Sequence, residues 1–384
     1  MWSRFSEVLS FDNTYKTNRF KMPLVNITGL TNINSIFNAG FGLIYTERQV
    51  EAIRIEIGAA LPKVGITDYD SNLKDALNET FPNMQQQICI FHINKNVLLK
   101  VKRKWKVPPG VVDVDDEDGP DAPRLADAEA DAAAAEGADE SAADHEILQD
   151  LNAPARTEEQ LQSSRLPAEI PHTREGVLML WKYMAYSNSE EDFMESWARL
   201  LEEFPDQEPI IEYLQTTYLP VRHQWANCYI KKYPNFGQRV TSPTESSHKD
   251  LKSYLIHGTS SLLRLSQAME EMIDNKRRTY QQDIARNEMR LRCAYMGREW
   301  AGQLPMHISY FAMDMIAKRY RHACAAMPTP GRDPQPLLPC TEAFSKQWGL
   351  PCSHTILQRL QMREPLDRRD VHSHWHLQRS VVSQ

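Results

Sequence analysis

Three acidic residues at distant positions could together perform metal-dependent chemistry. Asp12 and Asp68 follow the short apolar runs VLSF and VGIT, and Glu245 stands near the start of the helical segment SPTESSHKDLKSYL. Active sites of open sheets gather at the carboxyl ends of strands. Three carboxylates that converge there could hold two divalent cations about 3.5–4 Å apart, as in phosphoryl transfer. Mg²⁺ suits such a site because it binds few carboxylates and keeps positions for water and phosphate.

Each acid also has a purely structural interpretation. Asp12 could stabilise a turn, because aspartate bonds to nearby backbone groups. Asp68, or equally Asp70, could cap the helix that follows it. Glu245 fits a capping box in which Ser242 is the N-cap and Pro243 the first helical residue. Spacing alone does not decide between these interpretations and a metal site.

The elements around the acids indicate a mixed sheet. Strand-like runs cover residues 8–11, 23–30 and 36–44, and a helix with apolar residues at helical spacing is expected from Thr46 to Leu61. A strand then ends at Asp68, a helix follows, and a fifth strand-like run passes through Ile88 and Ile90. Three meandering strands followed by alternation of strand and helix are typical of an α/β sheet with helices on its faces.

The rest of the chain reads as helices around a low-complexity segment. Residues 113–150 contain fifteen Asp and Glu against one Arg, so this segment carries −14 and the remainder +7 of the net charge of −7. Such a segment cannot bury enough apolar surface to fold, and we expect disorder over residues 107 to about 170, the range that contains it. Helical patterns cover about 176–204, 243–255, 261–292 and 308–322. The basic remainder suits a polyanionic partner such as nucleic acid.

Three segments of the sequence resemble the catalytic region of Mutator-like transposases. This family includes transposase-derived transcription factors of plant far-red signalling. The segments are FDNTYKTNRFKMPL, GITDYDSNLKDAL with FPNMQQQICIFHINKN, and NFGQRVTSPTESSHKDLKSYL, and the resemblance covers about residues 5–260. It implies a ribonuclease-H-like α/β fold with an all-helical insertion and a mainly helical C-terminal region. It also implies an Asp-Asp-Glu triad of Asp12, Asp68 and Glu245 that holds two Mg²⁺ ions and cuts and joins DNA.

The resemblance also suggests a division of the chain. The family's zinc-binding DNA-recognition domain usually precedes the catalytic region, and its absence suggests a truncated copy, a partial gene model or a domesticated remnant. The expected parts are the first catalytic segment 1–106, the acidic insertion 107–170, the helical insertion 171–235, the last catalytic helix 236–260, a helical region 261–330 and a zinc-motif tail 331–384.

Cysteine and histidine pairs could bind zinc. In the tail, CTEAFSKQWGLPCSH resembles a SWIM zinc motif, in which Cys340, Cys352 and His354 match the last three ligands while Leu338 occupies the first ligand position. A closed zinc site needs four ligands. Either a further residue completes the site or zinc is lost; the candidates for the fourth ligand are Cys324, His372, His374 and His376. Cys89 and His92 form a weaker half-site, with a buried thiol as the simpler interpretation.

Basic residues indicate where DNA could bind. The cluster KVKRKWK contains Lys100, Lys102, Arg103 and Lys104, and it could bind DNA phosphates, act as a nuclear-import signal or end a solvated helix. His248 lies one turn after Glu245, where it could contact a phosphate, orient the acid or simply be exposed. If DNA binds at the basic cluster, the acidic segment beside it could compete as a phosphate mimic.

The composition and the resemblance lead to one prediction and one alternative. Without a long apolar run, a secretory signal or a disulfide pattern, we expect an intracellular protein with no membrane segment. The resemblance implies a nuclear DNA transposase that acts on transposon ends and target DNA, with homo-oligomerisation left open. The alternative is a domesticated DNA-binding or regulatory protein on the same fold without cleavage.

Overall fold

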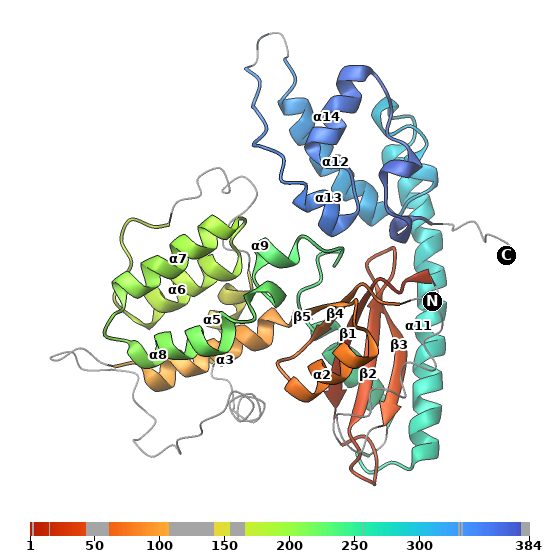
Figure 1. Cartoon of the computed structure of the whole chain (residues 1–384). Coiled ribbons are helices and arrows are strands. Elements are labelled where there is room, and N and C mark those ends of the chain that lie inside the picture. The colour runs from red at the N-terminus through yellow and green to blue at the C-terminus, as the bar shows by residue number, and fades with distance from the viewer. Residues whose placement is uncertain are drawn as a thin grey trace. The chain divides into compact units, whose positions relative to one another are not determined.

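The computed structural model describes residues 1, 4–14, 16–43, 61–106, 142–153, 166–255, 257–328, 331 and 333–377 (Figure 1). The chain forms two compact units. The sheet unit comprises Met1–Thr67, Asn72–Gln86 and Lys231–Gln384. The helical unit comprises Asp68–Ser71 and Gln87–Ile230. The helix expected from Thr46 to Leu61 lies almost entirely outside the described residues.

Five strands form one mixed sheet in the order β3-β2-β1-β4-β5. Their bounds are β1 Val8–Thr14, β2 Leu24–Leu30, β3 Ile36–Leu43, β4 Val64–Thr67 and β5 Gln85–Ile88. Strand β1 pairs antiparallel with β2 and parallel with β4, and β2 pairs antiparallel with β3. This order, followed by a mainly helical region, confirms the expected ribonuclease-H-like α/β fold.

One face of the sheet packs on helix α2 (Ser71–Thr80). Side chains alternate between the two faces of a strand, so Leu9 and Phe11 of β1 point to α2 and meet its Leu73 and Leu77. This cluster is apolar throughout. The face therefore contributes to the core and leaves the polar residues of β1 to the opposite side.

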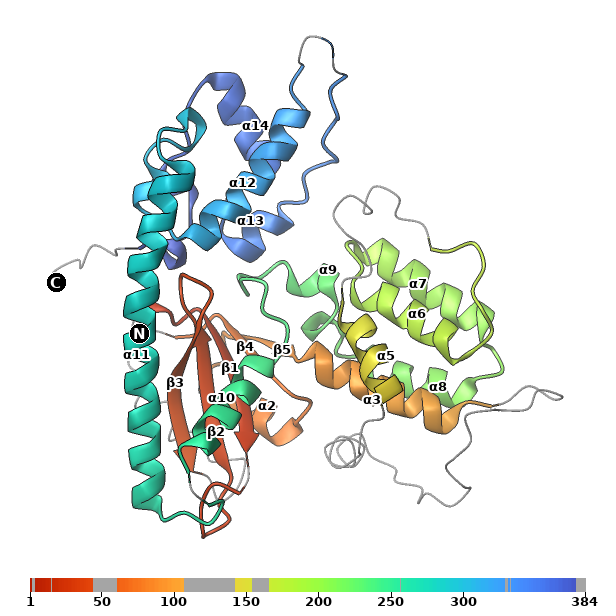
Figure 2. The same ribbon diagram turned by 180° about the vertical axis from the view of Figure 1, so that it is seen from behind.

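Helices α10 (Ser242–Ser253) and α11 (Leu262–Tyr295) cover the opposite face. Helix α10 packs on β1 and β2, and α11 packs on β3 (Figure 2). An apolar cluster joins them at one end of the sheet, where Leu24 meets Leu251, Leu265 and Met272. The rest of the surface between α10 and the strands is polar, and it carries Asp12.

The C-terminal region shares a core with the sheet. It contains α12 (Tyr310–Ala325), α13 (Ala343–Trp348), α14 (Ser353–Met362) and the short helices Glu299–Ala301, Leu304–Met306, Arg368–Asp370 and Ser373–Trp375. Val8 and Val64 of the sheet belong to the same buried cluster as Met313 and Trp375. Asn32 Nδ2 also donates to the carbonyl oxygen of His376 at 2.8 Å. The tail is therefore part of the sheet unit rather than a separate module.

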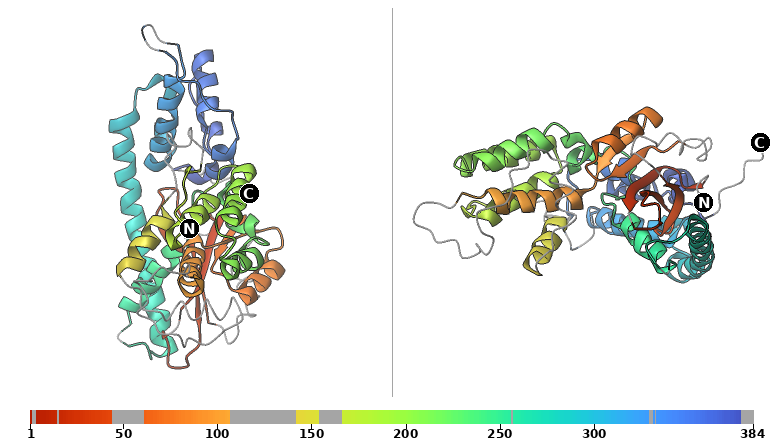
Figure 3. Two further views of the ribbon diagram at one scale, coloured as in Figure 1. Left: turned by 90° about the vertical axis from the view of Figure 1, so that its left-hand side faces the viewer. Right: turned by 90° about the horizontal axis from the view of Figure 1, so that it is seen from below.

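The helical unit is built around stacked aromatic rings. Its helices are α3 (Ile90–Lys104), α5 (Ala142–Asn152), α6 (Arg174–Ala185), α7 (Glu190–Glu203), α8 (Glu208–Tyr213), the π-helical turn Leu214–Tyr218, the 3₁₀ turn Arg222–Gln224 and α9 (Asn227–Ile230). Helices α6 and α7 pack side by side (Figure 3). The Trp181 and Trp225 rings stack 4.8 Å apart, and Trp181 Nε1 donates to Asn94 Oδ1 at 2.9 Å.

Three expectations for individual elements were wrong. Strand β1 continues to Thr14, so Asp12 lies inside the strand and not at its end. Strand β5 ends at Ile88 and α3 begins at Ile90, because the buried residues from Ile90 to Val101 recur at helical spacing. Helix α5 lies within the range 107–170 expected to be disordered, and it is held by buried Leu148 and Leu151.

None of the helices in the described ranges combines the length and apolar character needed to span a lipid bilayer.

Candidate functional site

Asp12 is buried on the face of the sheet that α10 covers. The residue is 8% exposed, and its Oδ1 accepts a hydrogen bond from the backbone N–H of Asn13 at 2.9 Å. It lies directly opposite Asn26 of β2 in the antiparallel ladder. Ser10, two residues earlier on the same face, is buried as well. A carboxylate therefore stands among polar side chains inside the unit, where an uncompensated charge would be costly.

Helix α10 carries Glu245 in its first turn, but without the expected capping box. The N-cap is Thr241 and not Ser242, and the Thr241 side chain makes no capping bond to the backbone. Its hydroxyl instead donates to Glu245 Oε1 at 3.3 Å. Because the helix starts one residue earlier than expected, Glu245 is one position too far along to close a capping box. Its half-buried carboxylate is held by a side chain of the preceding turn.

Hydrogen bonds fix α10 against the strands beside Asp12. The buried face of α10 has helical spacing and consists of Thr244, Ser247, His248 and Leu251. The hydroxyl oxygens of Thr244 and Thr28 are 2.6 Å apart, and both residues are buried.

Asn38 of β3 connects the strands to the same helix. Its Nδ2 donates both to Asn26 Oδ1 at 2.8 Å and to Ser247 Oγ at 2.7 Å. Lys276 of α11 adds its Nζ to Asn38 Oδ1 at 2.9 Å. Since Asn26 is level with Asp12, this network sets the position of α10 at the height of the acid.

His248 is in contact with Asp12 and is not an exposed surface histidine. Its Nδ1 lies 3.6 Å from Asp12 Oδ2, and the residue is 6% exposed. Burial, with a smaller effect of the Lys252 charge, lowers the pKa of His248 to about 4. The imidazole is therefore neutral at neutral pH. This position favours a role in orienting Asp12, and contact with a DNA phosphate stays a prediction.

Buried polar atoms without partners surround Asp12. Ser10 Oγ, Asn26 Nδ2 and His248 Nε2 make no hydrogen bond within the described parts of the chain. Leaving a buried polar group unpaired costs about 1–3 kcal/mol. Polar atoms of this kind beside a carboxylate fit a hydrated cation such as Mg²⁺, which keeps several of its waters as partners. The residues around Asp12 therefore fit the metal that the family resemblance implies.

Asp68 directly follows the last residue of β4 and belongs to the helical unit. The next residue is anchored within that unit, because Tyr69 Oη donates to the Thr217 carbonyl oxygen at 3.4 Å and its ring contacts that of Tyr218. In the described ranges, one group alone brings three potential ligand atoms within 4.8 Å of one another, and it consists of cysteine and histidine.

Residues 8–96, which include β1 to β5 and both aspartates, match the family model of the MULE transposase domain. The chain carries a MULE transposase domain. This confirms the resemblance to Mutator-like transposases for the matched range.

Several proteins are similar to this chain. The PKS-NRPS hybrid synthetase cheA of Chaetomium globosum is 33% identical over 395 residues, which cover 99% of the chain and 8% of that protein. Protein FAR1-RELATED SEQUENCE 5 of Arabidopsis thaliana is 27% identical over 114 residues, 28% of the chain and 14% of that protein. Zaragozic acid A biosynthesis cluster protein 8 of Cochliobolus lunatus is 32% identical over 80 residues, which cover 21% of the chain and 31% of that protein. The chain therefore spans less than a third of each of these relatives.

Outside the MULE domain, the tail brings together the three residues expected to bind zinc. The sulfur atoms of Cys340 and Cys352 are 3.9 Å apart, and Cys352 Sγ lies 3.9 Å from His354 Nδ1. Burial would raise the pKa of Cys352, but hydrogen bonds with Thr355 and His354 outweigh it and lower that pKa to about 6. His354 Nε2 lies 2.7 Å from the Leu338 carbonyl oxygen. Donation to this oxygen leaves Nδ1 free of its proton and able to bind a metal.

None of the four candidates for a fourth zinc ligand joins this group in the described structure. His374 Nδ1 lies 3.5 Å from Glu7 Oε2, and Arg368 Nε donates to His376 Nδ1 at 3.1 Å. His372 Nδ1 accepts from the backbone N–H of His374 at 3.2 Å. The Cys324 side chain forms a hydrogen bond with the Tyr320 hydroxyl. The histidines of the tail thus serve the packing of the sheet unit.

The remaining predicted site residues lie in the helical unit. Cys89 is fully buried at the start of α3, and His92 is half-buried; neither belongs to a three-ligand group among the described residues. Lys102, Arg103 and Lys104 form the exposed last turn of α3. Lys102 Nζ pairs with Asp144 Oδ1 at 2.7 Å. Lys100 Nζ lies 4.6 Å from the centre of the Tyr213 ring, a cation–π contact.

Sequence reasoning missed the polar network that holds α10. Its signal was present as asparagine in strands, since Asn26 and Asn38 interrupt β-branched and aromatic runs where asparagine is disfavoured. The contacts of Asn38 with Asn26 and Ser247 depend on the pairing of β2 with β3 and on the position of α10, which no local pattern gives.

Proposed function

We propose that this chain is the catalytic region of a DNA transposase that cuts DNA strands and transfers them to new sites. The match to the MULE transposase domain carries this proposal, because the matched range contains Asp12 and Asp68. The position of α10 supports it, since this helix brings Glu245 to the same sheet face and His248 into contact with Asp12.

The register of the parallel strands supports a common site for the two aspartates. Val8 pairs with Val64 and Ser10 with Ile66, an offset of 56 positions. The same offset separates Asp12 from Asp68. If this register continues two residues beyond the Ser10–Ile66 pair, Asp12 and Asp68 stand opposite each other on neighbouring strands and on the same face. Both would then point to the face that α10 covers.

In this proposal Asp12, Asp68 and Glu245 would hold two Mg²⁺ ions. The ions would supply an activated water for strand cleavage and would stabilise the oxygen that leaves. The chain's own residues set the geometry. His248 orients Asp12 through Nδ1, the Thr244–Thr28 bond keeps α10 on the sheet, and Thr241 holds the Glu245 carboxylate.

DNA contact and localisation belong to the same proposal. The exposed last turn of α3 offers Arg103 and Lys104 to backbone phosphates, which bind cations with little sequence preference. The same basic cluster is the proposed nuclear-import signal. The synthetase name of the fungal relative describes a protein of which this chain covers 8%, and nothing in the proposal rests on that name.

Zinc is proposed for the tail. Cys340, Cys352 and His354 would hold the ion. The fourth ligand would be a water molecule or another side chain. Zinc would cross-link the segment before α13 to the start of α14. Its contribution would be structural.

A DNA-binding or regulatory protein without cleavage is the second candidate. Similarity to FAR1-related proteins of Arabidopsis thaliana is compatible with either function.

Nicking of supercoiled plasmid DNA distinguishes the two candidates. The full chain should convert plasmid to the open-circular form with Mg²⁺ and not with chelator, and Asp12→Asn should abolish conversion. Asp70→Asn is the matched control, because Asp70 lies two residues after Asp68 and has no proposed role. DNA binding without nicking would establish the regulatory candidate. Equal nicking by the wild type and Asp12→Asn would reject the proposed site.

A further inference from the structure

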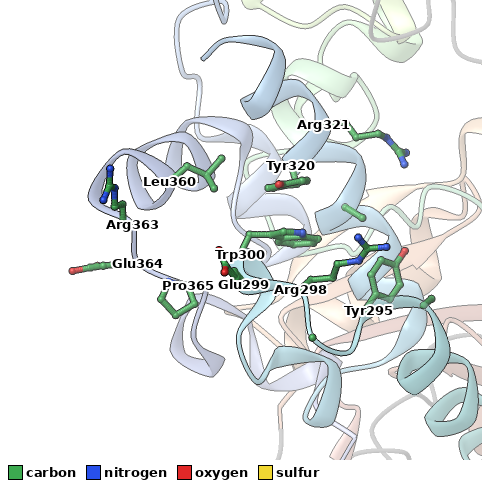
Figure 4. Close-up of a pocket in the computed structure, with 13 residues that line it drawn as sticks. Tyr295, Arg298, Glu299, Trp300, Tyr320, Arg321, Leu360, Arg363, Glu364 and Pro365 are labelled. Atoms are coloured by element: carbon green, nitrogen blue, oxygen red, sulfur yellow. The ribbon is translucent and has the colours of Figure 1, made fainter. Parts of the chain in front are cut away.

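An open cavity of about 1060 Å³ lies in the C-terminal part of the sheet unit, away from Asp12 in sequence and in the elements that form it. Its wall comes from the end of α11 with the loop after it, from α12, and from the end of α14 with the following turn (Figure 4). The volume is slightly above the range of about 300–1,000 Å³ that ligand sites usually occupy.

Aromatic rings form one part of this wall. The Trp300 and Tyr320 rings stack with their centres 4.2 Å apart and 14° between their planes, and both side chains are half-buried. Tyr295 also lines the cavity. The pKa of Tyr320 is raised to about 12, chiefly by its hydrogen bond with Cys324, and burial raises that of Tyr295 to about 12. Both phenols therefore stay neutral and add no negative charge.

Three arginines form the other part, and they are exposed. Within the described ranges, the guanidinium groups of Arg298, Arg321 and Arg363 make no ion pair or hydrogen bond with another side chain. Three arginines of α11 are instead paired: Arg264 with Glu271, Arg277 with Asp274 and Arg286 with Asp283. The cavity thus concentrates cations that the protein itself does not neutralise.

Two acids also line the cavity, and they do not cancel its charge. Arg359 Nη1 lies 2.6 Å from Glu364 Oε2 and so neutralises this carboxylate. Figure 4 shows the Glu364 side chain directed away from the aromatic pair. Of the charged side chains that line the cavity, this leaves one acid, Glu299, and three arginines. Figure 4 shows the Arg298 side chain beside Trp300, so this cation and the aromatic wall line the same part of the cavity.

We propose that this cavity binds an unpaired nucleotide of a DNA strand, with its base against the aromatic wall and its phosphate at Arg298. Phosphates of the neighbouring nucleotides would lie at Arg321 and Arg363, which Figure 4 shows on either side of the rings. Bases stack on aromatic side chains whatever their sequence, and arginine binds phosphate through paired N–H groups. A duplex keeps its bases inside, so single-stranded DNA is the form that fills both parts of the wall. The inference rests on the proposed function, which supplies DNA as the partner.

Fluorescence anisotropy with a labelled thymidine oligonucleotide tests this site on the full chain. The double variant R298Q/R363Q should weaken single-strand binding about tenfold or more, and binding of a duplex of equal length should change less than about twofold. R286Q is the matched control, since Arg286 lies exposed on α11 and pairs with Asp283. Trp300→Leu should weaken single-strand binding as well, with circular dichroism confirming the fold.

The outcomes separate this inference from the proposed function. Unchanged single-strand affinity in R298Q/R363Q rejects the cavity site, whether or not the wild type nicks plasmid. If R298Q/R363Q loses single-strand binding while the wild type does not nick plasmid, the cavity site is supported and the cleavage function is rejected. If free thymidine monophosphate competes as well as the oligonucleotide, the ligand is a soluble nucleotide and the assignment to a DNA strand is overturned.

Discussion

At the scale of single residues, the tail cysteines and Asp12 differ in how far the sequence predicts their surroundings. The resemblance of the tail to a SWIM zinc motif predicted that Cys340, Cys352 and His354 meet, and the three residues do lie together. The environment of Asp12 was not predictable in this way. Its neighbours Asn26 and His248 come from another strand and from a helix more than 200 residues later.

Zinc content tests the residue-scale proposal for the tail. The wild type should carry about one zinc ion per chain, and Cys352→Ser should lose it because a three-ligand site has no ligand to spare. Elemental analysis after dialysis measures the content. Cys324→Ser is the control, since Cys324 lies outside the ligand group and should leave the content unchanged. Zinc retained by Cys352→Ser, or absent from the wild type, would contradict the site.

At the scale of elements, periodicity predicted most strands and helices but not their ends. The strands of the sheet and the helices α2, α10, α11 and α12 stand close to where apolar spacing indicated them. The boundary between β5 and α3 was missed because Ile88 and Ile90 fit both an alternating and a helical pattern. The capping box predicted at Ser242 does not form, because α10 begins one residue earlier, with Thr241 as its N-cap.

The Thr244–Thr28 bond gives a prediction for α10. Thr244→Val leaves the buried Thr28 hydroxyl without its partner and should lower the free energy of unfolding by about 1–3 kcal/mol. Urea denaturation measures this, with Ser246→Ala on the exposed side of the same helix as control. The double variant Thr28→Val/Thr244→Val should recover part of the loss. A Thr244→Val protein as stable as the wild type would show that this bond does not hold the helix.

At the scale of the whole molecule, the sequence predicted a sheet interrupted by a helical insertion, and the two units agree with that. It did not predict that the tail joins the core of the sheet. Trp375 is fully buried, and its Nε1 donates to the Trp348 carbonyl oxygen at 2.6 Å. The contact of Phe236 with His374, 4.1 Å between ring centres, links segments that no local pattern relates.

The acidic segment gives a prediction at this scale. Asp144, at its C-terminal side, already pairs with Lys102 of the basic cluster. Replacing the twelve Asp and Glu of residues 113–140 by Asn and Gln keeps the length and removes the charge. Binding of duplex DNA at low salt should tighten by about three- to tenfold, and the difference should disappear at high salt. Equal affinity at low salt would show that the segment does not compete with DNA.

The binding of divalent ions tests the central claim most directly. Titration calorimetry with Mn²⁺, a close substitute for Mg²⁺ at carboxylate sites, should find two ions per wild-type chain. Asp12→Asn, Asp68→Asn and Glu245→Gln should each lose at least one ion, while Asp70→Asn keeps both. A wild type that binds no Mn²⁺, or acid variants that bind as many ions as Asp70→Asn, would contradict a shared metal site.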